Sequence, residues 1–165
     1  MRKIAFACSL LFLPIIVAAH PTTQLLTEQI KQKGAQAVIS SLYANDETEW
    51  QFVTGEIGKG GADWLRVAAL LAPGSDGASA ETLSEAVGMA IPHNPVGVLS
   101  IVTERYVPLS QAVVCGLPFY SMSETQLNNY VVDAIRALYK VPSSKACIDT
   151  MVNVIGESKG FNEDN

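Results

Sequence analysis

The sequence contains few of the residues on which most catalytic and metal sites depend. Among its 165 residues are two histidines, His20 and His93, and three cysteines. The cysteines form no CxxC pair, and the glycine-rich stretch 55–61 lacks the Ser or Thr that a P-loop requires after its lysine. These absences argue against a zinc ribbon, a nucleotide-binding loop and a histidine-rich active site, and we predict no cofactor.

Basic residues are also scarce. Eleven Lys and Arg face sixteen Asp and Glu, which gives a formal net charge of -5. A surface of this sign repels nucleic-acid phosphates and anionic lipid headgroups, and it favours a cationic partner or simple solubility. We therefore predict no nucleic-acid partner.

The first nineteen residues have the composition of a secretory signal peptide. Arg2 and Lys3 precede the uncharged, apolar run 4–18, which is too short to span a bilayer and ends in small residues. Cleavage after Ala19 would make His20 the N-terminus and, by removing two basic residues, change the net charge from -5 to -7. We expect a periplasmic or secreted protein that does not insert into the membrane after signal cleavage.

Two of the three cysteines remain in the processed chain, because Cys8 leaves with the signal peptide. Cys115 and Cys147 are therefore expected to form a disulfide in an oxidising compartment, which would stabilise the fold by roughly 4 kcal/mol. A reactive thiol or a metal-binding pair is the alternative, but neither cysteine has a neighbouring histidine.

Apolar residues recur at helical spacing, and no alternating segment predicts a strand. We predict an all-α fold, a compact array of short helical hairpins that is either HEAT-like or an irregular bundle, with one disulfide. The expected organisation is a signal peptide at 1–19, a polar leader at 20–33, one helical domain at 34–158 and a frayed tail at 159–165.

Several helix starts can be predicted from capping residues. Asn45 with Asp46, and Asp63, are expected to cap two successive helices, and Asn94 followed by Pro95 is expected to begin another. Ser123 and Gln126 form a capping box before the longest predicted helix, from Glu124 to about Lys140. Periodicity does not decide whether 109–119 is helical. The helix that follows Asn45 and Asp46 carries several carboxylates, including Glu49 and Glu56. We interpret them as the solvent-exposed face of that helix.

No catalytic set is evident, so a protein-binding module is favoured over an enzyme. The turns at the ends of stacked helical hairpins commonly form one edge, and we expect the turns 58–63, 74–78 and 92–95 to lie near the contact surface. The individual candidates for this interaction are Gly60, Asp63, Asp76, His93 and Asn94.

In size, class and compartment the chain resembles periplasmic immunity proteins, which block a toxin by binding it. This resemblance implies a stoichiometric inhibitor of a basic toxin or enzyme, and an envelope structural or assembly factor is the alternative. An N-terminal His20 also resembles, in this one residue, secreted copper oxygenases and periplasmic copper carriers. His20 and His93 are therefore weak metal candidates, although those families are β-sandwiches and this chain is predicted to be helical.

Overall fold

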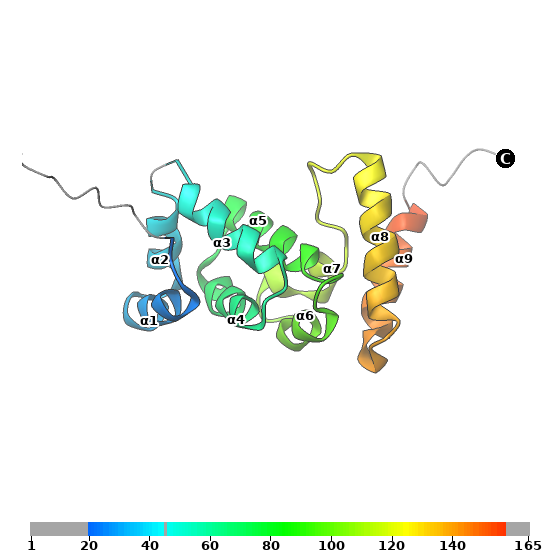
Figure 1. The fold of residues 1–165 in the computed structure, drawn as a ribbon, viewed down its shortest axis with the longest axis horizontal. Coiled ribbons are helices and arrows are strands. Elements are labelled where there is room, and N and C mark those ends of the chain that lie inside the picture. The colour runs from blue at the N-terminus through cyan, green and yellow to red at the C-terminus, as the bar shows by residue number, and fades with distance from the viewer. Residues whose placement is uncertain (1–19, 45, 158–165) are drawn as a thin grey trace, which may run out of the picture.

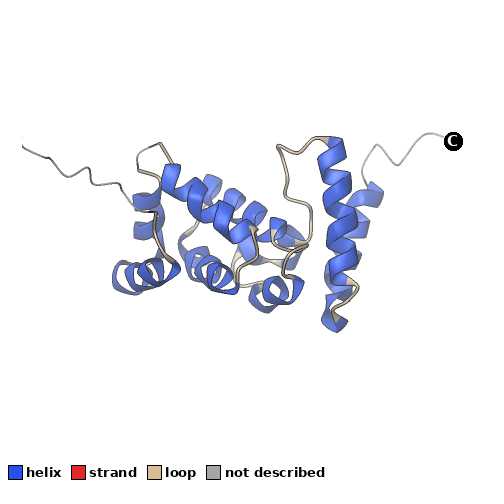
Figure 2. Cartoon of the chain, in the orientation of Figure 1, coloured by secondary structure: helices blue, strands red, loops and turns tan. Residues whose placement is uncertain are grey.

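A computed structural model describes residues 20–44 and 46–157, and all the regular structure within them is helical. Figure 2 shows these helices joined by turns and short loops. This confirms the predicted all-α fold. The α-helices of this part of the chain are α1 (Thr23–Lys33), α2 (Ala35–Leu42), α3 (Thr48–Gly58), α4 (Ala62–Leu71), α5 (Gly77–Met89), α6 (Pro95–Ile101), α7 (Gln111–Val114), α8 (Glu124–Leu138) and α9 (Lys145–Glu157).

The N-terminal segment differs from the polar leader expected at 20–33. Thr22 caps α1, because its Oγ1 accepts a hydrogen bond from Leu25 N at 3.2 Å. Leu26 and Ile30, one helical turn apart, are buried where α1 packs against α2 and α4. A narrow apolar stripe among polar residues is enough to attach a helix to a core. The helical body therefore begins before residue 34.

Helices α3 to α6 form two layers. Figure 1 shows α3 and α5 above α4 and α6, and the contacts pair α3 with α5 and α4 with α6. Near the starts of the upper helices, Trp50 Nε1 donates to Thr82 Oγ1 at 2.8 Å. Near their ends, Gly58 lies beside Met89. Helices α3 and α5 are therefore parallel, as expected when α4, which lies between them in the sequence, runs in the opposite direction.

Two predicted helix caps differ from the structure. Helix α3 has Glu47 at its N-cap, in a left-handed conformation (φ 62°) without a side-chain cap, and Asn45 lies outside the described residues. Helix α4 is preceded by Gly61, so Asp63 lies in its first turn and forms an ion pair with Arg66. In that turn a carboxylate still stabilises the helix through its dipole.

Two other caps are confirmed. Asn94 Oδ1 accepts from Gly97 N at 2.9 Å and caps α6. Ser123 and Gln126 form the predicted capping box, and α8 behind it is the longest of the described helices. In the undecided stretch 109–119 the only α-helix is the single turn α7, followed by an irregular loop.

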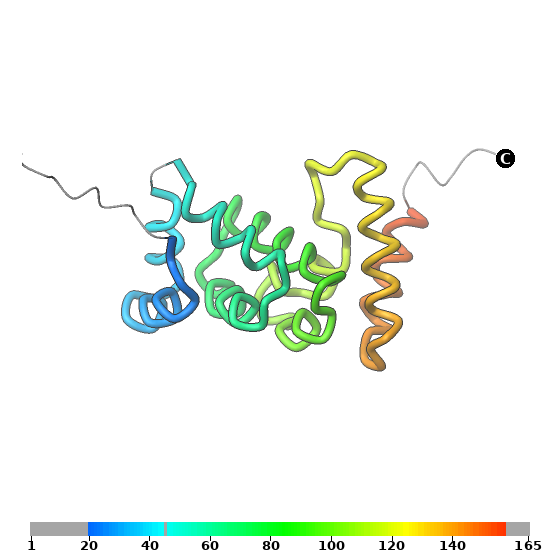
Figure 3. Tube along the Cα trace, in the orientation of Figure 1, coloured from blue at the N-terminus to red at the C-terminus, as the bar shows by residue number. Residues whose placement is uncertain are grey.

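The C-terminal helices form an antiparallel pair that stands across the end of the stack, as the chain trace in Figure 3 shows. The predicted disulfide is confirmed: Cys115, directly after α7, is bonded to Cys147 in α9, with Cα atoms 5.3 Å apart. Tyr130 of α8 is buried and donates from its hydroxyl to Gly88 O of α5 at 2.7 Å. Burial raises the pKa of the Tyr130 phenol. One covalent bond and one buried hydrogen bond therefore attach the pair to the stack.

None of the helices within 20–44 and 46–157 is long and apolar enough to cross a bilayer. The signal peptide expected at 1–19 and the tail expected at 159–165 lie outside the described residues.

Candidate functional site

The structure brings two of the three predicted turns together. Gly60 is buried with φ 77°, and its carbonyl oxygen accepts a hydrogen bond from Asn94 Nδ2 at 2.8 Å. A Cβ atom on Gly60 would lie 3.1 Å from the Cβ atoms of both His93 and Asn94. The turns 58–63 and 92–95 are therefore adjacent, but Gly60 and the Asn94 amide hold the fold together and are not free for a partner. His93 and Asp63 are exposed.

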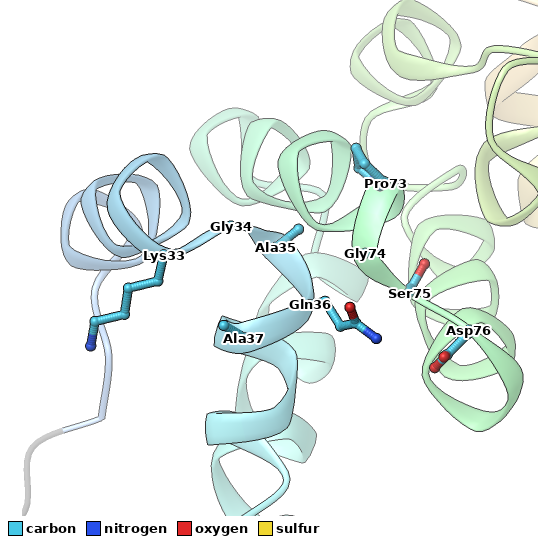
Figure 4. A pocket seen from close by; sticks show the side chains of 9 residues that line it. All are labelled: Lys33, Gly34, Ala35, Gln36, Ala37, Pro73, Gly74, Ser75 and Asp76. Carbon is cyan, nitrogen blue, oxygen red and sulfur yellow. The ribbon is translucent and has the colours of Figure 1, made fainter.

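The third turn, 74–78, lies at the opposite end of α5. Figure 4 shows Gly74 and Asp76 beside the start of α2, where they line a shallow hollow with Lys33 and Gln36. A Cβ on Gly74 would lie 2.2 Å from Gln36 N, so the two backbones are in close contact. Asp76 itself is exposed. The five predicted interaction residues therefore do not form one surface.

The two histidines lie at opposite ends of α3. His20 stacks on Phe52, with ring centroids 4.1 Å apart, and its Nδ1 is 3.5 Å from Glu49 Oε1 in the first turn. His93 instead lies against Gly60, beyond the last turn of the same helix. A site with both imidazoles on one metal is therefore not formed. No group of three or more His, Cys, Asp or Glu in the described part of the chain could hold a metal ion.

A groove runs along the upper layer between α3 and α5, with a volume of about 430 Å³; its lining includes charged side chains, although most of its exposed surface is apolar. Gly55, Gly58 and Ala86 are among its lining residues, and their small size leaves space between the parallel helices. Lys59, Glu85 and His93 also line it. The polar side chains of this groove do not place a nucleophile beside a general base, so they do not indicate a particular reaction.

A second groove lies on the C-terminal pair and is apolar. It has a volume of about 420 Å³ and contains no charged side chain. We call it the α8–α9 groove, and its lining residues are Leu117, Leu127, Asn128, Val131, Val132, Val154 and Ile155. Val132 is 54% exposed and Val154 is 37% exposed. Exposed apolar surface of this kind is typical of interaction sites for other proteins and of ligand-binding grooves.

The walls of the α8–α9 groove come from segments that the disulfide holds together. Leu117 follows Cys115 and has a left-handed backbone (φ 59°), and Phe119 N donates to its carbonyl at 2.8 Å. Val154 and Ile155 belong to α9, to which Cys115 is bonded through Cys147. The bond therefore fixes the loop wall relative to the α9 wall.

Sequence reasoning missed this groove. The helical pattern placed Leu127 and Val131 on the buried face of α8, and both are partly buried there. Val132 lies outside that stripe, and Val154 lies outside the apolar repeat of α9, so each is an apolar residue at a position where an amphipathic helix normally has a polar one. These apolar residues at normally polar positions were the sequence signal from which the groove could have been predicted.

Comparison with protein-family models, with curated proteins and with solved structures found no match for this chain. The assignment of a site therefore depends on the chain's own geometry. By that criterion the α8–α9 groove is the strongest candidate, because its side chains would lose unfavourable contact with water if a partner covered them.

Proposed function

We propose that this protein acts by stoichiometric binding of another protein, and that the α8–α9 groove is the docking site. The observation that carries the proposal is an uncharged groove with half-exposed valines on a helix pair fixed by the Cys115–Cys147 disulfide. A rigid apolar surface loses little conformational entropy when it binds, so more of the burial energy remains as affinity.

The shape and charge of the surface suggest the chemistry of the partner. A groove between two helices accepts the apolar face of a helix or an apolar loop, with side chains at Val132 and Val154 as the first contacts. The whole chain is acidic, with a formal charge of -5 before processing and -7 after removal of 1–19. A partner with an apolar anchor flanked by basic residues is therefore favoured, and its association would be faster at low salt.

An exported inhibitor or immunity protein directed at a basic toxin or enzyme is the form of this function that we favour. The parallel course of α3 and α5 supports a short HEAT-like stack as the scaffold that carries the C-terminal pair. A structural or assembly factor of the envelope is the second candidate, since an apolar groove could equally hold a permanent partner. Copper binding is less favoured, because the two histidines are at opposite ends of α3.

The proposal is tested by site-specific photo-crosslinking in the cells that produce the protein. A photoreactive residue replaces Val132 in the groove or, as a matched control, Val107, which is 72% exposed and outside the groove. We expect one discrete adduct from position 132 and none from position 107. Mass spectrometry of the adduct then identifies the partner.

Calorimetry with the identified partner completes the test. We expect one-to-one binding that Val132→Asp weakens at least tenfold and that Val107→Asp leaves unchanged, because a buried carboxylate without a counter-ion costs more than about 1.4 kcal/mol. Equal weakening by both variants, or an adduct only at position 107, would remove the groove from the proposal. Inhibition of the partner's activity identifies an inhibitor, whereas an unaffected partner in a stable assembly identifies the structural role.

A further inference from the structure

The carboxylate of Glu49 is incompletely satisfied within the described residues. Glu49 lies in the first turn of α3, and its Oε1 is 3.5 Å from His20 Nδ1. Its other oxygen, Oε2, is buried and has no hydrogen-bond partner in this part of the chain. A buried acceptor without a donor typically costs about 1–3 kcal/mol, so a donor for Oε2 is expected.

The residue closest to this carboxylate is held in place by aromatic contacts. The His20 ring is stacked nearly parallel to the Phe52 ring (7°), and Phe52 in turn makes an edge-to-face contact with Trp64, with ring centroids 6.0 Å apart. These contacts position His20 over the first turn of α3. Nδ1 and the backbone nitrogen of His20 are joined through three carbon atoms, so the contact between Nδ1 and Glu49 Oε1 places the backbone nitrogen within one residue's length of this carboxylate.

We propose that the Ala19–His20 peptide bond is the processing site of the chain and that the α-ammonium group released at His20 binds Glu49 Oε2. A peptidase adds water across the bond, so that Ala19 leaves as a carboxylate and His20 gains an amine, which is protonated at neutral pH. Val17 and Ala19, the third and the first residue before the bond, have the spacing of small residues that such a peptidase accepts.

Cleavage changes the donor in two ways that favour this contact. The amide of a continuous chain offers one neutral N–H, whereas the α-ammonium offers three and carries a positive charge. Charge-assisted hydrogen bonds are shorter and stronger than neutral ones. Processing would therefore stabilise the first turn of α3. This inference concerns the N-terminal end of the molecule and does not depend on the proposed binding function.

The test combines two changes in four proteins. The first change is at the N-terminus: one form begins at His20, released with a native terminus from a cleavable fusion, and the other form carries the additional residues Ala18 and Ala19. The second change is at residue 49, because each of these two forms is made with Glu49 and with Glu49→Gln. We expect the extension to raise the unfolding equilibrium constant about three- to tenfold when Glu49 is present, and to have no effect in Glu49→Gln, because the neutral amide has lost the charged partner. Urea unfolding at neutral pH measures all four.

Two controls establish whether the effect of the extension belongs to this ion pair. Glu47→Gln, at the exposed N-cap of the same helix, should retain the full effect of the extension. The intact mass of the exported protein should correspond to a chain that begins at His20. An extension effect of the same size in Glu49→Gln, or a mature mass that begins elsewhere, would overturn the proposal. Stabilisation of the processed chain by added Cu²⁺ or Zn²⁺, lost in Glu49→Gln, would also overturn it by making a metal the partner of Glu49.

Discussion

The N-terminal stack, α1 to α6, and the C-terminal pair, α8 and α9, bury their apolar side chains to different extents. In α3 the residues Trp50, Val53 and Ile57 are all buried, and α4 buries four side chains. Helix α9 buries only Cys147 and Met151 and exposes Val152 and Val154. The stack is therefore held by its core, whereas the pair also depends on a covalent bond.

The difference suggests why the disulfide lies where it does. A helix pair that leaves apolar residues accessible gains less from burial than a helix inside the stack, and it is correspondingly easier to detach. The Cys115–Cys147 bond and the Tyr130 hydrogen bond compensate for this at the base of the pair. Val152 and Val154 can therefore remain exposed without loss of the fold.

The largest expected effect is on the disulfide. Cys115→Ser combined with Cys147→Ser should lower the free energy of unfolding by about 2–5 kcal/mol, because the open chain gains conformational freedom when it unfolds. Urea unfolding with and without reductant measures this. Reductant should destabilise the unaltered protein and leave the double variant unchanged. An unaltered protein that is insensitive to reductant would show that the core alone holds the pair.

Two glycines provide a matched comparison between the regions. Gly74→Ala in the stack should cost about 2–4 kcal/mol, because its Cβ would lie 2.2 Å from backbone N of Gln36. Gly156→Ala in α9 meets no atom within 4 Å and should stabilise by about 0.5–1 kcal/mol through helix propensity. Thermal unfolding of both variants checks the prediction. Similar destabilisation by both would contradict the view that α9 is less closely covered by its neighbours than the stack helices are.

Removal of a single oxygen atom should weaken the contact between the N-terminal stack and the C-terminal pair. Tyr130→Phe removes the hydroxyl that donates to Gly88 O, while that carbonyl keeps its hydrogen bond from Ile91 N at 3.0 Å, so we expect a loss of about 0.5–1.5 kcal/mol. Tyr130 lies face to edge with Phe119, and the variant keeps this ring contact. Urea unfolding at neutral pH measures the loss.

The same phenol predicts a pH dependence. Burial raises the pKa of Tyr130 above its value in the unfolded chain, about 10. The folded state therefore keeps its proton where the unfolded state loses it, and stability should fall as the pH rises above about 10. Tyr130→Phe should flatten this part of the profile. An unchanged alkaline profile in the variant would assign the effect to other groups.

Much of the fold could be predicted from the sequence because its signals are local. The capping box at Ser123 and the cap at Asn94 each depend on residues three positions apart, and the disulfide followed from having only two cysteines after processing. The start of α3 was wrong because Glu47 adopts a left-handed backbone that no composition rule selects. Helix α1 was missed because only its tertiary contacts show that Leu26 is core.

The candidate sites were harder to predict because they depend on contacts between distant segments. The α8–α9 groove requires the loop at Leu117 and the end of α9 to meet, and no spacing within either segment shows this. The contact of His20 with Glu49 likewise joins residues that are separated in the sequence by the whole of α1 and α2. Gly60 and Asn94 were predicted to be interaction residues in exposed turns, but they form a hydrogen bond with each other and are not available to a partner.

The smallest effect on stability is expected at Val132, and it is the sharpest test of the comparison. Val132 is 54% exposed, so Val132→Asp should change the free energy of unfolding by no more than about 0.5 kcal/mol. The same substitution should lower the fluorescence of a hydrophobic dye bound to the free protein, because a carboxylate would lie in the uncharged α8–α9 groove. Val107→Asp, on an exposed valine outside the groove, should leave the dye signal unchanged. A large loss of stability from Val132→Asp would mean that the groove belongs to the core, and the distinction between a self-sufficient stack and a pair with a surface kept for binding would then fail.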